Sequence, residues 1–162
     1  MNKTNRAQPS DQADAVTTPA TVLIVDDNKG VLDFLLLLLS KHSFTVVGAS
    51  SGAECLNIVR SRSVDLIILD VMMPIMDGLQ VCQELKKIAP AIPVILLTAR
   101  DDLVTRAAAM DLGVSEFVAK PVNNRDLLNR VRTQLRSVEW EKANEQVFSK
   151  IAGSAAQTDT KT

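Results

Sequence analysis

Five short apolar segments, each followed by a segment with helical spacing, constrain the fold of this chain more than any other feature. The clearest runs from Val64 to Asp70, where an almost unbroken apolar stretch ends in a carboxylate. An apolar run this short indicates a strand buried on both faces, which is typical of a parallel sheet. Similar runs lie at 21–25, 44–49, 93–98 and 116–119. Strands that alternate with helices predict an α/β fold, a doubly wound parallel sheet covered by helices on both faces.

The segments between and after these strands predict the helices and the domain limits. Helical spacing is expected over 29–42, 51–62, 78–89, 101–112 and from Asn124 to about Ile151. We interpret residues 1–20, which are polar and lack periodicity, as a disordered N-terminal tail. Residues 21–138 are then one domain, and residues 139–162 are a helical C-terminal extension that ends in a frayed tail.

Composition excludes several classes of protein. The chain carries 18 basic and 19 acidic side chains, so its net charge gives no reason to expect nucleic-acid or membrane binding. Its longest apolar run, Phe34 to Leu39, is too short to cross a bilayer. The two cysteines, Cys55 and Cys82, form no CxxC motif, which fits a reducing compartment. We therefore expect a cytoplasmic protein with no membrane insertion and no direct nucleic-acid contact.

Polar groups stand at the ends of four of the five predicted strands. They are Asp26 with Asp27, Asp70, Thr98 and Lys120. The carboxyl ends of parallel strands meet at one edge of the sheet, so these side chains are expected to converge there. Three clustered carboxylates repel one another unless a cation compensates, and Mg²⁺ prefers such oxygen ligands. The pattern predicts a magnesium site beside a lysine and a hydroxyl group.

This set of groups favours phosphoryl transfer. An aspartate can act as a nucleophile and form an aspartyl phosphate, and Asp70 is the candidate. A metal ion and Lys120 would neutralise the phosphoryl oxygens, while the Thr98 hydroxyl could donate to one of them. No glycine-rich loop of a dinucleotide site is present.

The same residues resemble a known family. The resemblance rests on Asp26-Asp27, Asp70 with Met73-Pro74 and Asp77-Gly78 behind it, Thr98-Ala99 and Lys120-Pro121. In this order they are similar to the receiver domain of two-component response regulators, of the single-domain, chemotaxis-regulator-like kind. The resemblance covers residues 21–138 and implies a flavodoxin-like (βα)5 fold with strand order 2-1-3-4-5, here followed by an extended C-terminal helix.

The resemblance also implies roles for the site residues. Asp70 would be the phosphoacceptor, served by a sensor histidine kinase or a histidine phosphotransfer protein. Asp27, Asp70 and the backbone carbonyl of Met72 would ligate Mg²⁺ directly, and Asp26 would act mainly through a water molecule. Lys120 would contact the phosphoryl group, and the Lys120-Pro121 bond is where the family carries a cis peptide bond.

A switch is implied as well. Thr98 would move toward the phosphoryl group, and Phe117, three residues before Lys120, would then turn inward. The 101–138 surface would report this change to a downstream protein or through a homodimer.

Two further positions would set the lifetime of the phosphorylated form. Met72 and Arg100, each two residues after a site residue, should flank the phosphoryl group. An apolar Met72 cannot orient an attacking water molecule, so slow self-dephosphorylation is expected.

The leucine-rich stretch after the acid pair has two interpretations. Helical spacing places Val31 and Leu35 on a stripe that faces the sheet, and Phe34 widens this stripe. The same spacing turns Leu32 and Leu36 toward solvent. Either these two leucines are scattered exposed residues beside a wide core stripe, or they form a docking face for the histidine-bearing helices of the kinase.

We expect a signalling component without separate enzymatic turnover, and three alternatives stay open. The chain could be a phosphorelay intermediate, or a receiver fragment of a larger transcription factor or signalling enzyme. It could also be a relative of the haloacid-type phosphatases, although the Asp-x-Asp motif of that family is missing around Asp70. The extension, 139–151, could mediate dimers or fold onto the domain.

Overall fold

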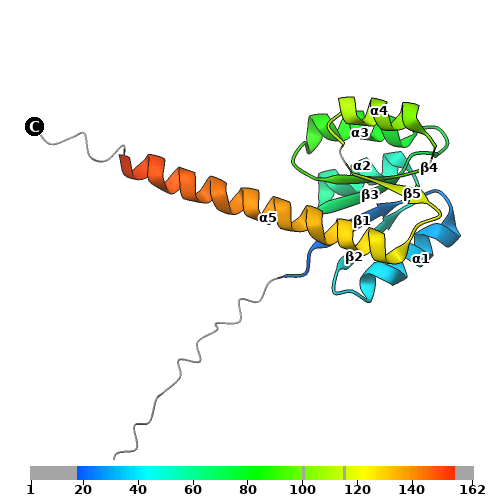
Figure 1. The fold of residues 1–162 in the computed structure, drawn as a ribbon, viewed down its shortest axis with the longest axis horizontal. Helices are drawn as coiled ribbons and strands as arrows, with labels where there is room; N and C mark the ends of the chain where they lie inside the picture. The colour runs from blue at the N-terminus through cyan, green and yellow to red at the C-terminus, as the bar shows by residue number, and fades with distance from the viewer. Residues whose placement is uncertain (1–17, 100, 115, 156–162) are drawn as a thin grey trace, which may run out of the picture.

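The computed structural model describes residues 18–99, 101–114 and 116–155, and these form the expected α/β fold (Figure 1). All strand pairs are parallel, in the order β2-β1-β3-β4-β5, which confirms the flavodoxin-like prediction. The strands are β1 (Thr21–Val25), β2 (Thr45–Ala49), β3 (Leu66–Asp70), β4 (Val94–Ala99) and β5 (Glu116–Lys120). The helices are α1 (Lys29–Ser40), α2 (Gly52–Ser61), α3 (Gly78–Ile88), α4 (Leu103–Asp111) and α5 (Asn124–Ala155). Most of the predicted N-terminal tail, residues 1–17, lies outside the described residues.

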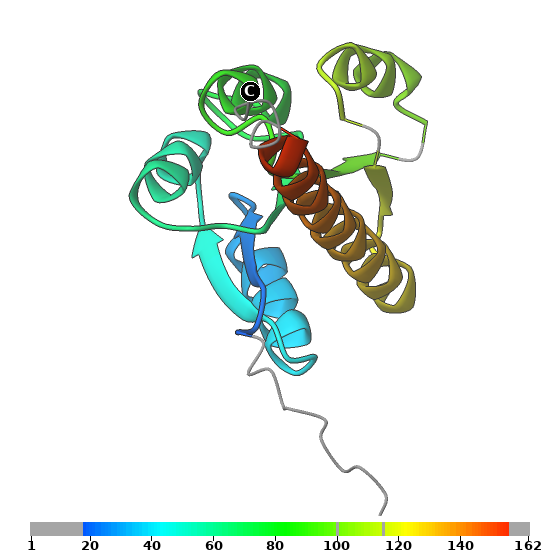
Figure 2. The same cartoon turned by 90° about the vertical axis from the view of Figure 1, so that its left-hand side faces the viewer.

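Helices cover both faces of the sheet, in three layers (Figures 1 and 2). Alternate strand residues such as Leu23 and Val25 pack against α2, α3 and α4. Their neighbours Val22 and Ile24 pack against α1 and α5 on the other side. All five residues of the central strand β3 are buried. Burial on both faces explains why the strands are continuous apolar runs without alternation.

Local capping sets where the helices begin. Asp77 and Gln80 form a reciprocal capping box at the start of α3, with both hydrogen bonds at 2.9 Å. This fixes the helix immediately behind the loop that follows Asp70. Asp102 caps α4 by accepting a hydrogen bond from the Thr105 N–H, so this helix begins at Leu103 and not at Asp101.

Helix α1 corrects the prediction for the leucine-rich stretch. Leu32 and Leu36 are half-buried and pack against the core over β2, so the prediction that they turn toward solvent is wrong. A Cβ atom on Gly48 of β2 would lie 3.0 Å from Leu36 Cδ1. Because glycine has no side chain, Leu36 has room to pack over β2 at this position. Phe34, expected in the core stripe, is instead 47% exposed. The helix contacts the edge strand β2 more extensively than β1, and this placement cannot be deduced from spacing along one helix.

Helix α5 reaches well beyond the domain. Its 32 residues span about 48 Å at the usual rise per residue. Leu127, Leu128 and Val131 anchor its first turns on the sheet, and the remainder projects away from the body (Figure 1). The predicted extension is therefore helical as far as Ala155. Within the described part of the chain, no helix combines the length and apolar character needed to span a membrane.

Candidate functional site

Three carboxylates and one ammonium group meet at the carboxyl edge of the sheet. Asp26 directly follows β1, and Asp70 and Lys120 are the last residues of β3 and β5. One carboxylate oxygen each from Asp26, Asp27 and Asp70 lies within 4.8 Å of the others. The residues that sequence reasoning singled out are therefore brought together, although up to 94 positions separate them in the chain.

Lys120 is held by both buried carboxylates. Its Nζ lies 2.7 Å from Asp70 Oδ1 and 3.5 Å from Asp26 Oδ2. Partial burial of the ammonium group works against its charge. The hydrogen bond and charge of Asp70, helped by Asp26, outweigh that effect and raise the pKa of Lys120. Lys120 is therefore a fixed cation beside Asp70.

Asp26 is the electrostatically strained member of the cluster. It is fully buried, and its Oδ1 accepts a hydrogen bond from the Asn28 N–H at 2.9 Å. Among the described residues, no donor hydrogen-bonds to its Oδ2. Burial, reinforced by the charge of Asp70, raises the pKa of Asp26, although the Asn28 N–H and Lys120 oppose the shift. A buried carboxylate oxygen without a hydrogen bond is suited to accept a cation or a metal-bound water molecule.

The acidic cluster fits a divalent cation on chemical grounds. Its ligand atoms are hard carboxylate oxygens, two of them from buried side chains and one from the exposed Asp27. An exposed member leaves room for the water molecules that Mg²⁺ retains. Asp26, Asp27 and Asp70 are thus the residues that could hold such an ion, beside Met72, whose backbone N–H approaches Asp70 Oδ1 at 3.4 Å.

The loop after Asp70 depends on Gly78 at a close approach of two backbones. A Cβ atom at Gly78 would lie 2.7 Å from the Asp70 carbonyl oxygen and 2.8 Å from Val71 Cα. The Gly78 N–H also donates to the Val71 carbonyl at 2.9 Å. Only a residue without a side chain lets α3 begin this near to β3. The Asp-Gly pair was noticed in the sequence, but this reason for it was not.

Thr98 and Phe117 are joined by a residue that sequence reasoning missed. Thr98 is buried in β4, one position beyond the pairing of Asp70 with Leu97. Arg106 of α4 donates from Nε to Thr98 Oγ1 at 3.4 Å, and its Cζ lies 5.7 Å from the Phe117 ring centroid. Nothing in the sequence singles out Arg106, because only the placement of α4 against β4 and β5 brings the three side chains together. Arg100 lies outside the described residues.

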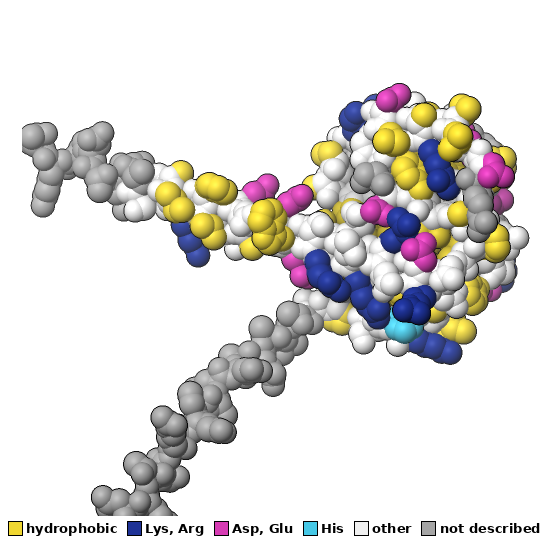
Figure 3. Space-filling view, viewed as in Figure 1, with side chains coloured by type: hydrophobic (Ala, Val, Ile, Leu, Met, Phe, Trp, Pro, Cys, Tyr) yellow, Lys and Arg dark blue, Asp and Glu magenta, His cyan; other side chains and the backbone are white. Residues whose placement is uncertain are grey.

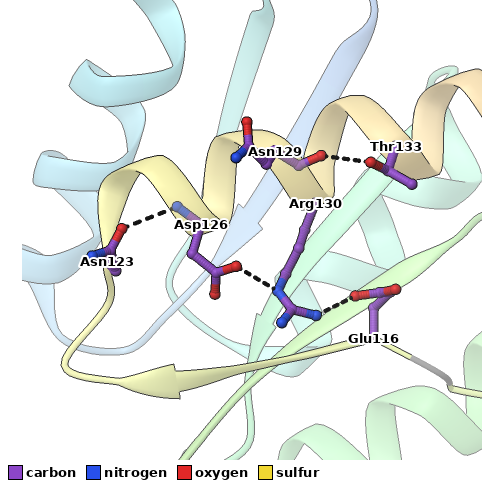
Figure 4. A network of polar contacts seen from close by, with 6 residues as sticks. All are labelled: Glu116, Asn123, Asp126, Asn129, Arg130 and Thr133. Atoms are coloured by element: carbon purple, nitrogen blue, oxygen red, sulfur yellow. Dashed lines mark hydrogen bonds and ion pairs between the residues drawn. The ribbon is translucent and has the colours of Figure 1, made fainter.

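The outer surface of β5 and α5 carries a polar network (Figure 4). Arg130 contacts Glu116 at 2.7 Å and Asp126 at 3.0 Å. The hydrogen bond to Glu116 is the main reason that the pKa of Arg130 is raised. Between Glu116 and the start of α5, the Lys120-Pro121 peptide bond is cis. The contacts tie the first turns of α5 to the strand that carries Lys120.

Comparison with known proteins identifies the family. The family model of the response regulator receiver domain matches residues 22–132. The chain belongs to this family. Curated relatives of this receiver domain include the response regulators MprA of Mycobacterium sp. (strain KMS) and Mycobacterium tuberculosis (strain ATCC 25177 / H37Ra). The first is 38% identical over 118 residues, which are 73% of this chain and 51% of that protein. The second is 38% identical over 131 residues, which are 81% and 57%. The chain spans about half the length of the curated relatives it matches.

Solved structures agree with this assignment. A response regulator receiver domain protein from Clostridium thermocellum superposes with a TM-score of 0.71 at 33% identity, over 75% of this chain and 98% of that one. The signal receiver domain of an HD domain-containing protein from Pseudomonas fluorescens Pf-5 gives a TM-score of 0.75 at 30% identity, over 82% and 98%. Receiver domains from these two organisms thus share the fold described above.

Proposed function

We propose that this receiver domain accepts a phosphoryl group on Asp70 from a phosphohistidine, carried by a sensor histidine kinase or a histidine phosphotransfer protein. The observation that supports this most directly is the 2.7 Å contact of Lys120 Nζ with Asp70 Oδ1, at a strand end that two further carboxylates share. A nucleophilic carboxylate, a fixed cation and a metal-binding cluster are the parts that phosphoryl transfer to an aspartate needs.

In the proposed reaction, an oxygen of Asp70 attacks the phosphorus atom. A P–O bond to Asp70 forms while the P–N bond to histidine breaks, and the electron pair of that bond stays on the imidazole nitrogen. Lys120 exchanges part of its contact with the carboxylate for the transferred phosphoryl oxygens. Mg²⁺, held by Asp26 through water, by Asp27 and Asp70, and by the Met72 carbonyl, would supply further positive charge for those oxygens.

Incubation with Mg²⁺ and a small acyl-phosphate donor tests this proposal. Intact mass should rise by about 80 Da in the wild type, the adduct should be lost with Asp70→Asn, and chelation of Mg²⁺ should prevent it. Asp65→Asn is the matched control, because Asp65 stands just before the same strand at the opposite edge. An adduct that survives in Asp70→Asn, or one that forms equally well without Mg²⁺, would overturn the assignment.

The donor helix has a place to dock beside Lys120. An apolar hollow lies between the start of α1 and the β5–α5 loop, lined by Asn28, Gly30, Val31, Phe34, Leu35, Lys120, Pro121 and Val122. A histidine-bearing helix resting there would present its phosphohistidine to the site edge. Phe34, rather than Leu32 or Leu36, is then the docking residue on α1. Phe34→Glu should slow transfer from a protein donor but leave transfer from a small donor unchanged.

We further propose that the switch runs through Thr98, Arg106 and Phe117 to the 101–138 surface. If the Thr98 hydroxyl turns to a phosphoryl oxygen, it gives up the long 3.4 Å hydrogen bond from Arg106. The Arg106 guanidinium also covers the Phe117 ring, so a change at Thr98 can reach Phe117. The output would be a contact with a downstream protein or a second copy, not with nucleic acid.

The domain would work in the cytoplasm, since both thiols are buried and free. It would have no enzymatic turnover beyond its own phosphotransfer.

The proposed phosphorylated form should be long-lived. Met72 is 77% exposed at the site, and its thioether side chain offers no strong hydrogen-bonding group to orient a water molecule. Met72→Asn should shorten the phosphoryl half-life at least about tenfold, in line with the usual contribution of a positioned polar group. The decay of the mass adduct after donor removal measures this. A wild-type half-life of seconds at neutral pH would contradict the expectation.

A further inference from the structure

The projecting part of α5 carries an apolar stripe that the receiver body does not cover. Trp140, Val147, Phe148 and Ile151 are each more than half exposed. Apolar side chains follow the projecting helix in the space-filling view (Figure 3). The residues that pack α5 onto the sheet include Val131 and Leu135. At 3.6 residues per turn, the stripe lies on the opposite side of the helix from these two, so the body of the same chain cannot bury it.

We propose that this stripe pairs with the same stripe of a second copy in a short, parallel, in-register coiled coil. Trp140, Asn144, Val147 and Ile151 follow one another at spacings of four, three and four residues. This is the alternation of d and a positions in a heptad, with Trp140 and Val147 at d and Asn144 and Ile151 at a. Unlike the homodimer through the 101–138 surface, this pairing does not depend on phosphorylation of Asp70.

Asn144 points to a second copy as the occupant. Its amide group both donates and accepts hydrogen bonds, so two Asn144 side chains facing each other can satisfy one another. An asparagine at an a position is a known device for fixing register and a two-stranded state. A helix of unrelated sequence would have to offer its own matching amide at this level, whereas a second copy does so by symmetry.

The flanking positions favour the parallel orientation. Arg136 at a g position and Glu141 at the following e position have opposite charge and are five residues apart. In a parallel pair, each g residue faces the next e residue of the partner, so two Arg136–Glu141 contacts form. The next such pair sets Phe148 against Ala143, a large residue against a small one. An antiparallel pair would instead bring g against g and place Arg136 of one copy against Lys150 of the other, two groups of like charge.

A hollow on α5 also suits a partner helix. It is lined by Thr133, Arg136, Ser137, Trp140 and Glu141, along the line that continues the stripe toward the body. The small side chains of Thr133 and Ser137 leave space beside the Trp140 indole. A knob from the facing helix, including the partner copy of Trp140, could pack there.

Sedimentation equilibrium of the full chain, without phosphodonor and in an Asp70→Asn background, tests the pairing. The unaltered stripe should give a dimer at about 100 µM. Val147→Glu with Ile151→Glu should weaken association at least about a hundredfold, because both charges would be buried. Gln146→Glu with Ser149→Glu is the matched control, since it adds the same charge to the same turns on the opposite side. It should change association less than about twofold.

Two further variants separate the outcomes. Arg136→Glu should weaken the dimer about fivefold, and adding Glu141→Arg should restore it. Val147→Cys should form an intermolecular disulfide on oxidation, whereas Ser149→Cys should not. A monomer at all concentrations, which would leave the stripe to another protein or to solvent, overturns the proposal. So does a dimer that survives Val147→Glu with Ile151→Glu, because it must use another surface. None of these outcomes bears on phosphorylation of Asp70.

Discussion

The Asp26 carboxylate is fully buried, and burial raises its pKa above the ordinary value of 3.8. The folded protein therefore holds this proton to a higher pH than the unfolded chain does. The stability linked to the group is present at low pH and is lost as the pH rises through the interval between the unfolded and folded values. At neutral pH the ionised Asp26 is a cost to stability that a bound cation can offset.

Asp26→Asn should accordingly raise the free energy of unfolding at pH 7, in EDTA, by about 1 kcal/mol. The gain should shrink as the pH falls and disappear below 3.8, where the wild-type carboxyl becomes protonated in both states. Urea denaturation at a series of pH values measures this. Asp27→Asn, at the exposed carboxylate of the cluster, is the control and should change stability less. A variant less stable than wild type at pH 7 would show that Asp26 is not strained.

The close approach of two backbones at Gly78 leads to a second prediction for a single residue. Gly78→Ala should lower the free energy of unfolding by about 2 kcal/mol, because the new methyl group would collide with the backbone of Asp70 and Val71. It should also slow phosphorylation, since relief of the collision moves Asp70. Gly153→Ala in the projecting helix meets no atom within 4 Å and should cost nothing. Equal urea midpoints for the two variants would refute the steric argument.

Among the helices, α4 is the one least secured by packing. Ala109 is its buried residue, whereas α3 buries Gly78, Val81, Cys82 and Leu85. Leu103, Val104 and Met110 of α4 are all exposed. Elements with few buried contacts open locally at low free energy, and switching segments are drawn from them. The proposed output surface thus includes the helix whose movement costs the least free energy.

We expect amide hydrogen exchange in α4 to be faster than in α3. Arg106→Met, which keeps an apolar stem over Phe117 but removes the donor to Thr98, should accelerate exchange in α4 and β5 about threefold. Hydrogen-exchange mass spectrometry measures both effects. Arg125→Met on the exposed start of α5 should leave α4 unchanged. Unaltered exchange in Arg106→Met would mean that the 3.4 Å contact does not hold the helix.

On the scale of the whole molecule, the receiver body and the projecting helix are separate in packing. Leu135 packs against the core and Val138 is half-buried, but the side chains that follow are almost all exposed. Their removal takes little apolar area from the folded body, so its stability should not depend on them.

A chain that ends after Lys142 should therefore melt within about 2 °C of the full chain at low micromolar concentration. It should also take up the phosphoryl group at the same rate, but without phosphodonor it should not dimerise. Circular dichroism melts and the mass assay check the first two expectations. A fall in melting temperature beyond about 5 °C would show that the extension stabilises the body.

The sequence by itself determined the fold class, the strand order through resemblance, and the candidates Asp26, Asp70, Thr98 and Lys120. It could do so because burial on both faces leaves a continuous apolar run, and parallel strands deliver their carboxyl ends to one edge whatever the side-chain detail. The predicted helix limits were also close to the observed ones, because capping depends on residues that are near in the sequence.

Only the tertiary structure decided which side chains meet across elements. The placement of α1 over Gly48 leaves Leu32 and Leu36 half-buried and Phe34 exposed, against the expectation from helical spacing. The contacts of Arg106 depend on how α4 sits beside β4 and β5. Spacing along one helix gives the relative direction of its side chains, but not the neighbour each will find. That choice rests on the packing of elements far apart in the chain.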